Sequence, residues 1–348
     1  MRTLFTIFII LFTTLTTYAQ SSSEQLIKQG VALHDKGRYK DAVASYEEAL
    51  KVNPTSMSAV YEMSLSYLQL KDYDKAIKNS TKVITANFRP LLMDAYIVKG
   101  TALANQGKIS EALKLLNEAL DKCGDEYLLH FNLGLCYFND KNNRMAAQHL
   151  RKAIEIDATR ASAFLLYAYA LNDMGRWVQS FYSFHFFLLL EPNTERSKDA
   201  FGEMFDIINT NLDNDQAKLS LEEGVDRKQV YEAIRRKKTG STDPVSQYKF
   251  FVEASKIIFF NLGQMQDNTQ SGLLWFFFVP TYDEMLGSGH FETYCRYVSV
   301  AYFPESLKWW DNHKAEVDNF IEWFEQGQSS SEDDAYFEDD SDEEEDAQ

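Results

Sequence analysis

The amino-acid sequence predicts an all-α helical solenoid, and three observations support this fold class. Small residues recur at intervals of 34, 36, 34 and 34 residues, at Ala42, Ala76, Ala112, Ala146 and Ser180. A similar local context of small, aromatic and aliphatic residues surrounds each of them. A helical spacing of apolar residues continues beyond the last recurrence. A repeat of this length is typical of stacked helix pairs, because one pair cannot bury its apolar face alone.

The repeated residues fit a pair of antiparallel helices. Small residues are needed where the two helices cross closely, which explains Gly30, Gly100 and Gly134 on the first helix of a pair. Pro54 and Pro192 stand where a second helix should end, because proline lacks an N–H group and clashes with the preceding turn. The two extra residues after Pro90, Leu91 and Leu92, should lie in a loop between repeats.

This pattern resembles the tetratricopeptide repeat (TPR), and the resemblance covers residues Ser23 to Thr194. It implies about five repeats stacked into a right-handed superhelix, followed by degenerate helical repeats and a capping helix. It also implies a scaffold that binds another protein or a peptide segment rather than an enzyme. We therefore expect a TPR array over residues 21–194, an aromatic-rich helical region over 195–327 that continues the solenoid, and a disordered acidic tail over 328–348.

Helical periodicity continues into the aromatic-rich region, where Ala200 to Leu212 predicts a helix. Val245 to Leu262 has helical periodicity, and Gly272 to Val279 is so apolar that it reads as a fully buried helix. Ser306 to Glu325 is amphipathic and predicts one capping helix that closes the solenoid.

The first twenty residues predict a secretory signal peptide. Arg2 precedes an apolar run from Leu4 to Leu15, and Thr17-Tyr18-Ala19 resembles a cleavage site. The ending Tyr-Ala-Gln resembles signal peptides of Bacteroidetes, which indicates export to the periplasm. The alternative is an N-terminal membrane anchor, although the apolar run is shorter than the ~20 residues that a spanning helix needs.

The charge of the chain is concentrated at its C-terminal end. The formal net charge is −17, and Glu332 to Asp346 contains eleven carboxylates and no basic residue. An acidic surface excludes nucleic acid as a partner, because phosphates require a basic one. The tail is either a solubilising segment or an acidic arm anchored by Tyr336 and Phe337. The basic run at residues 235–238 reads as a solvated helix end.

The sequence offers little support for catalysis, a metal or a small-molecule cofactor. The three cysteines, Cys123, Cys136 and Cys295, lack the spacing of a disulfide framework or a zinc site, although one disulfide or three free thiols remain open. His290 with Glu292, and His313 with Glu316, lack the HExxH spacing, and no glycine-rich phosphate loop accompanies them.

The TPR resemblance places the binding site on the concave face, lined by the first helix of each repeat. Repeat positions 2, 5, 9, 12 and 13 point inward in this family. Positions 5 and 9 hold apolar or aromatic residues and carry neither lysine nor arginine, so a clamp for C-terminal carboxylates is not implied. We expect one groove for an extended or helical protein segment, with carboxamides that bond its backbone. The predicted lining residues are Tyr61, Asn105, Phe131, Leu135, Asn139, Tyr169 and Asn172.

Two alternatives to an open groove follow from the same residues. A helix of the chain itself could cover the apolar stripe. The protein could also be a structural or assembly subunit of an envelope complex, which should show an apolar patch outside the groove.

Overall fold

The structure is a computed structural model that describes residues 22–209, 227–238, 240–267 and 269–331. Within these ranges every regular element is a helix, in agreement with the predicted fold class. The predicted signal peptide and the acidic residues from Glu332 onward lie outside the described ranges. The chain divides into two compact units, Met1–His149 and Leu150–Gln348, and each is described by itself.

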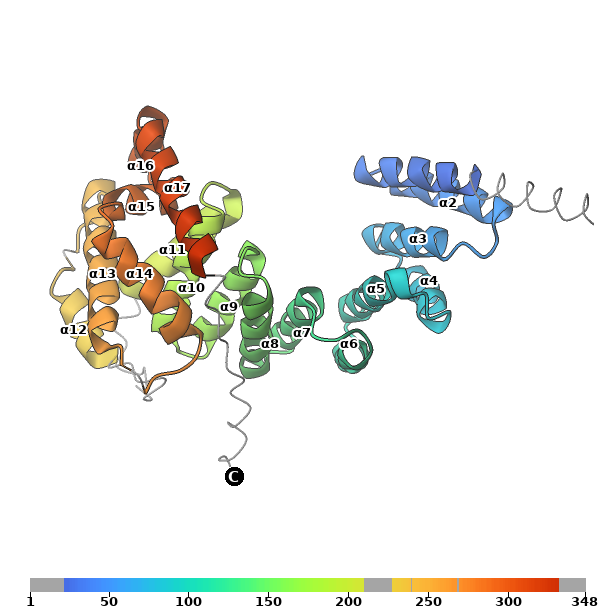
Figure 1. Cartoon of the computed structure of the whole chain (residues 1–348), viewed down its shortest axis with the longest axis horizontal. Coiled ribbons are helices and arrows are strands. Elements are labelled where there is room, and N and C mark those ends of the chain that lie inside the picture. The colour runs from blue at the N-terminus through green and yellow to red at the C-terminus, as the bar shows by residue number, and fades with distance from the viewer. Residues whose placement is uncertain (1–21, 210–226, 239, 268, 332–348) are drawn as a thin grey trace, which may run out of the picture. The chain divides into compact units, whose positions relative to one another are not determined.

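The first unit consists of antiparallel helix pairs stacked in chain order (Figure 1). It begins with a helix over residues 22–35. A 3-10 turn, η1 (Arg89–Leu91), precedes α5. The other helices are α2 (Tyr39–Val52), α3 (Met57–Gln69), α4 (Tyr73–Thr85), α5 (Leu92–Asn105), α6 (Ile109–Cys123) and α7 (Tyr127–Asn139). The boundary between the units falls within α8 (Asn143–Ile156).

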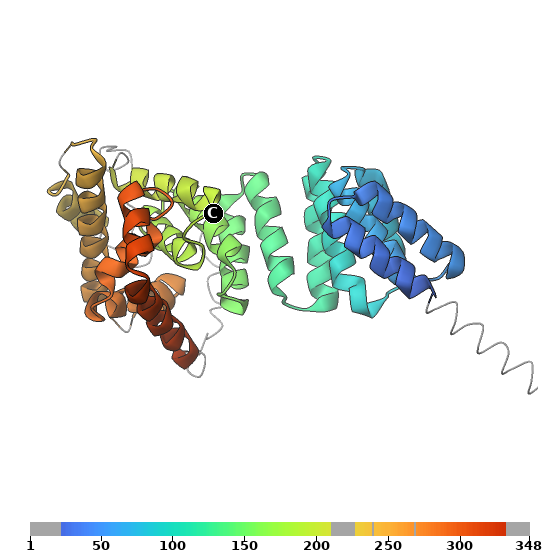
Figure 2. The same ribbon diagram turned by 90° about the horizontal axis from the view of Figure 1, so that it is seen from above.

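The second unit contains helices of more varied length, from 8 residues in α15 to 22 in α13, and Figure 2 shows them from above. A π-helix, η3 (Leu274–Phe278), runs directly into α14. The helices are α9 (Ala161–Asp173), α10 (Trp177–Leu190), α11 (Glu195–Asn209), α12 (Arg227–Arg235), α13 (Pro244–Met265), α14 (Val279–Gly287), α15 (Phe291–Val298), α16 (Pro304–Asn312) and α17 (Lys314–Ser331).

The small residues lie at the helix crossings that the repeat predicts. Ala42, Ala76 and Ala112 are each the fourth residue of a second helix, and all three are fully buried. A Cβ atom on Gly30 would lie 2.3 Å from Cε1 of Tyr46, and one on Gly100 would lie 3.0 Å from Cδ2 of Leu116. A larger residue would therefore separate the helices of its pair, which confirms the predicted repeat register.

Each repeat turns through one residue in the left-handed region, two positions before its second helix. Glycine provides it in three repeats, as at Gly37 (φ 73°), but lysine does so at Lys71 (φ 59°) and Lys141 (φ 62°). The left-handed conformation costs a non-glycine residue ~1–2 kcal/mol. The turn geometry is therefore set by the packing of the helix pair rather than by glycine alone.

Helix α10 is the centre of the second unit, and its residues from Val178 to Leu189 are all buried. Ser180, the fifth small residue of the repeat, donates a hydrogen bond from Oγ to the carbonyl of Ala168 (2.8 Å). Ser183 donates in the same way to the carbonyl of Phe164 (2.8 Å). Both hydroxyls are satisfied by α9, so serine serves at a close crossing with no unpaired polar group.

Two predictions for the aromatic-rich region are wrong in detail, whereas the helix at Val245–Leu262 is confirmed as part of α13. Gly272–Val279 is not a fully buried helix, because η3 turns the side chain of Phe276 outward, with 65% of it exposed. The single helix predicted from Ser306 to Glu325 is two helices that meet at His313. Nδ1 of His313 bonds the carbonyl of Trp309 (2.7 Å), and this bond competes with continuation of the helix.

The extra residues after Pro90 are only partly a loop. Leu91 closes η1, but Leu92 begins α5 and is 3% exposed. Leu92 is therefore a core residue. The predicted loop is therefore limited to the 3-10 turn η1, which precedes α5.

Candidate functional site

The predicted inner residues of the first unit lie on neighbouring first helices. Tyr61 is on α3, Asn105 is the last residue of α5, and Phe131, Leu135 and Asn139 are on α7. Helices α3 and α5 contact each other directly, as do α5 and α7. The first helices of these repeats therefore form a continuous layer, which we call the first-helix surface of unit 1.

These side chains are at least partly accessible, although Tyr61 also packs against the core cluster of Val60, Val83 and Ala95. Tyr61, Phe131 and Leu135 are partly buried, and Asn105 and Asn139 are exposed. Phe131 stacks on the ring of Tyr127 from the preceding turn, with ring centroids 5.9 Å apart. The surface thus presents aromatic and aliphatic side chains with free carboxamides at the helix ends, the composition of a peptide-binding surface.

Two carboxylates, Glu62 on α3 and Asp94 on α5, accompany Tyr61 and were not among the predicted residues. Burial raises the pKa of Asp94, and burial followed by the charge of Asp35 raises the pKa of Glu62. Burial, then Asp94 and Glu62, raises the pKa of the Tyr61 phenol. In the described part of the chain neither Glu62 nor Asp94 forms an ion pair. Asp94 occupies repeat position 2, so the family pattern could have found it.

The other two predicted residues belong to α9 in the second unit. Tyr169 is partly buried, and its ring meets the ring of Phe184 edge to face at 5.2 Å. Burial, then Glu203 and Asp199, raises the pKa of Tyr169. Asn172 is partly buried and precedes the last residue of α9, whereas Asn105 and Asn139 end their helices. Its carboxamide therefore stands one residue earlier in the repeat.

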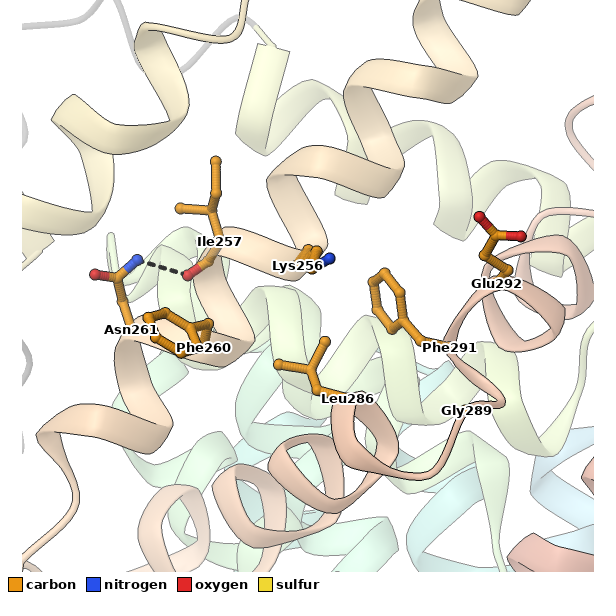
Figure 3. Close-up of a pocket in the computed structure, with 8 residues that line it drawn as sticks. All are labelled: Lys256, Ile257, Phe260, Asn261, Leu286, Gly289, Phe291 and Glu292. Carbon is orange, nitrogen blue, oxygen red and sulfur yellow. Dashed lines mark hydrogen bonds between the residues drawn. The ribbon is translucent and has the colours of Figure 1, made fainter.

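A further cavity lies in the second unit, between α13, α14 and α15. Its volume is ~550 Å³, within the range typical of ligand sites. Figure 3 shows Phe260, Leu286 and Phe291 around it, one from each of the three helices, and Ile257 of α13 also lines it. Phe260 is 55% exposed, which is unusual for a phenylalanine without a partner.

A second cavity, of ~390 Å³, continues along α13 toward α16. Both cavities are lined by Glu292. The guanidinium of Arg296 covers the ring of Tyr248 at 4.0 Å and forms part of the wall. We call the two cavities together the α13 groove. It is lined along α13 by Lys249, Val252, Glu253, Lys256, Ile257 and Phe260.

The histidines considered for catalysis pack against aromatic rings. His290 lies 5.3 Å from the ring of Trp323, and His313 stacks on Trp309 at 4.4 Å. Within the described residues no group of three or more His, Cys, Asp or Glu side chains could hold a metal ion. Cys123, Cys136 and Cys295 are free thiols, and Cys123 is only partly buried.

Over the same described ranges, none of the helices combines the length and apolarity required to cross a bilayer.

Comparison with known proteins places repeats where the spacing predicts them. A TPR repeat model matches residues 30–71, and tetratricopeptide repeat models match residues 58–89 and 97–163. The BBSome complex member BBS4 of Bos taurus is 26% identical over 129 residues, which are 37% of this chain and 24% of that protein. Small glutamine-rich tetratricopeptide repeat-containing protein 2 of Saccharomyces cerevisiae is 32% identical over 106 residues, 30% of either chain. This chain therefore spans under a third of the length of these relatives.

Solved structures show similar arrangements of helices. PilF of Pseudomonas aeruginosa has 18% identity and a TM-score of 0.49, and the match covers 63% of this chain and 99% of that one. A thermophilic TPR protein of Thermus thermophilus has 22% identity and a TM-score of 0.45, with 54% and 99% covered.

Three findings agree on the repeat. Repeat models match the chain, the small residues recur at an interval of about 34 residues, and those residues lie where the helices of each antiparallel pair cross. Stacked repeats of this kind act as protein-interaction scaffolds, because they present extended concave surfaces. Residues 30–89 and 97–163 match tetratricopeptide repeats, and every regular element in the described part of the chain is a helix, as an all-α TPR-type fold requires.

Proposed function

We propose that this protein is an adaptor that holds a segment of another protein on the first-helix surface of unit 1. The observation that carries the proposal is the partial exposure of Tyr61 on α3 and of Phe131 and Leu135 on α7, two helices that both contact α5. The repeat itself requires small or core residues at the crossings, but it does not require aromatic residues on this face. Partly exposed apolar side chains on the first helices of the second and fourth repeats favour a binding partner that covers them.

The chemistry of the surface favours a segment with both apolar and basic residues. An apolar side chain would pack between Phe131 and Leu135, and Asn105 and Asn139 would bond the backbone of the segment. A lysine or arginine would lie over Tyr61, where Glu62 and Asp94 supply negative charge. A cation offsets the cost of holding partly buried carboxylates without an ion pair. We propose that Tyr169 on α9 packs against a side chain of a bound segment and that Asn172 bonds its backbone.

The proposed place of action is the periplasm. The support is the sequence of residues 1–20, with a basic start, an apolar run and a small-residue cleavage site. A structural or assembly subunit of an envelope complex is the second candidate. The exposure of Phe260 (55%) and Phe276 (65%) outside the repeats favours that candidate.

Substitution of the aromatic anchors tests the adaptor function. We expect Tyr61→Ala with Phe131→Ala to weaken capture of the partner from an envelope extract at least thirtyfold, because one truncated anchor typically costs ~2 kcal/mol. The measurement is quantitative mass spectrometry of proteins retained by each variant. The matched control is Val52→Ala, which alters a 38%-exposed apolar residue on α2. Unchanged retention by a variant that melts like the parent would exclude this surface as the binding site.

A further inference from the structure

The α13 groove has an apolar floor and an unbalanced positive rim. Lys249 and Lys256 are exposed on α13, and neither forms an ion pair with a carboxylate in the described ranges. Of the two glutamates in the groove, Glu253 is paired with Lys237 at 3.4 Å. The groove therefore attracts negative charge, although the whole chain carries a net charge of −17.

The end of α12 adds to this positive charge. The ion pair between Lys237 and Glu253 brings the basic run at residues 235–238 beside α13, and Arg235 and Arg236 are exposed there. An acidic ligand in the groove would thus meet cations along α13 and at the end of α12. An apolar floor beneath this charge selects a ligand with aromatic or aliphatic groups between its carboxylates.

We propose that the occupant of the α13 groove is the acidic C-terminal segment of this chain, residues 332–348. The segment holds eleven carboxylates around one aromatic pair, Tyr336-Phe337. The two rings would lie on the floor formed by Phe260, Leu286 and Phe291, and the flanking carboxylates would face the lysines and the end of α12. Charge and side-chain type thus match on both sides of the contact.

The end of α17 brings this segment within reach. Trp323 lies 5.3 Å from the ring of His290, and His290 stands between Gly289 and Phe291 of the groove wall. From Trp323 to the end of α17 at Ser331 the helix advances ~12 Å. The five or six residues from there to Tyr336 and Phe337 add up to ~20 Å. This span exceeds the ~12 Å that α17 advances beyond Trp323, so the chain can return to the groove wall at Gly289 and Phe291.

The charge pattern also argues against another place for the segment. On the first-helix surface of unit 1 its carboxylates would meet Glu62 and Asp94, which are themselves partly buried and unpaired within the described residues. Like charges repel at such a surface. The sequence alone allowed the C-terminal region to cover the inner stripe of the repeats, but charge favours the α13 groove for its acidic end.

Photo-crosslinking of the full chain tests the proposal. We expect Phe260→p-benzoylphenylalanine to crosslink to residues 332–348 of the same molecule, identified by mass spectrometry of the monomer band. The matched control is Phe276→p-benzoylphenylalanine, a phenylalanine of the same unit that is 65% exposed, against 55% for Phe260, and is not among the residues that line the groove. Equal crosslinking from both positions would mean nonspecific attraction and would overturn the proposal.

Two further changes separate the outcomes. The double variant Tyr336→Ser with Phe337→Ser leaves α13 to α15 unaltered and should reduce the crosslink from position 260 at least tenfold. The double variant Lys249→Glu with Lys256→Glu should reduce this crosslink to the same extent. A crosslink that appears only in a dimer band and grows with concentration would assign the occupant to a second copy and overturn the intramolecular proposal. The absence of any crosslink to 332–348 would overturn it as well. Either result leaves partner capture by Tyr61 and Phe131 untouched, so this proposal can fail while the adaptor function stands.

Discussion

His185 of α10 joins three helices of the second unit through buried polar contacts. Its side chain is fully buried, Nδ1 forms a hydrogen bond with the hydroxyl of Tyr294, and Nε2 lies 3.4 Å from Oγ of Ser255. A neutral imidazole has one donor and one acceptor nitrogen, which suits a hydroxyl on each side. Burial lowers the pKa of His185 to about 3, so the ring is neutral in the folded protein at physiological pH.

This histidine makes the second unit sensitive to acid. The folded pKa lies below the unfolded value of ~6.5, so the unfolded chain binds the extra proton. The stability contribution is complete above pH ~6.5 and is lost as the pH falls toward 3, by up to ~1.4 kcal/mol per pH unit. All five tryptophans belong to the second unit, so denaturation followed by tryptophan fluorescence at pH 7.5 and pH 5 measures this loss.

The control separates His185 from other titrating groups. His185→Gln should be less stable than the parent at pH 7.5 but should lose less stability between pH 7.5 and pH 5. A parental slope in His185→Gln would show that other groups cause the acid sensitivity.

The sequence predicted the place of individual residues where a repeat position allows only one kind of side chain. Ala42, Ala76 and Ala112 could be placed at helix crossings because only a small side chain fits there. Lys71 could not be recognised as a left-handed turn residue, since lysine carries no such signal and only packing imposes the conformation. Glu62 was missed beside Tyr61 because the charge of a site depends on which first helices lie side by side.

The helix pairs of the repeats were predictable from the sequence, but the elements of the aromatic region were predictable only in part. Apolar density predicted burial for residues 272–279, yet the π-turn at Leu274–Phe278 rotates Phe276 to the surface. Amphipathic spacing predicted one capping helix, but a local hydrogen bond at His313 divides it. The α13 groove had only a weak signal, a mixed stripe from Lys249 to Phe260, because its walls come from α14 and α15.

The close crossing of α5 and α6 can be tested by overpacking. Ala112 is fully buried in the same cluster as Tyr96 and Leu116, so Ala112→Trp should destabilise the first unit by ~1–3 kcal/mol or more. Thermal unfolding followed by circular dichroism at 222 nm measures the effect. The neighbouring Glu111→Trp adds the same ring at an exposed position and should melt like the parent. Similar melting of both variants would contradict the repeat register.

On the scale of the whole molecule, the protein separates charge and apolar surface between two units. The first unit offers an apolar surface with unpaired carboxylates within the described ranges, and the second offers an apolar groove with a positive rim. The two surfaces are built from different helices, α3 to α7 in the first unit and α13 to α16 in the second. They share no residue, so each can be altered by substitution without changing the side chains of the other.

The last prediction concerns the start of the mature protein. The first described helix begins at residue 22, and Oγ of Ser23 already donates to the carbonyl of Ala49 (3.1 Å) within the folded unit. Cleavage after Ala19 or Gln20 would leave only one or two residues before this helix, so the folded unit would be complete after processing. We expect N-terminal sequencing of the protein from its host to find Gln20 or Ser21 in the periplasmic fraction. Ala19→Arg should block processing, because the cleavage site requires a small residue, and should leave an intact precursor. An intact Met1 on the unaltered protein in the membrane fraction would instead identify residues 1–20 as an anchor.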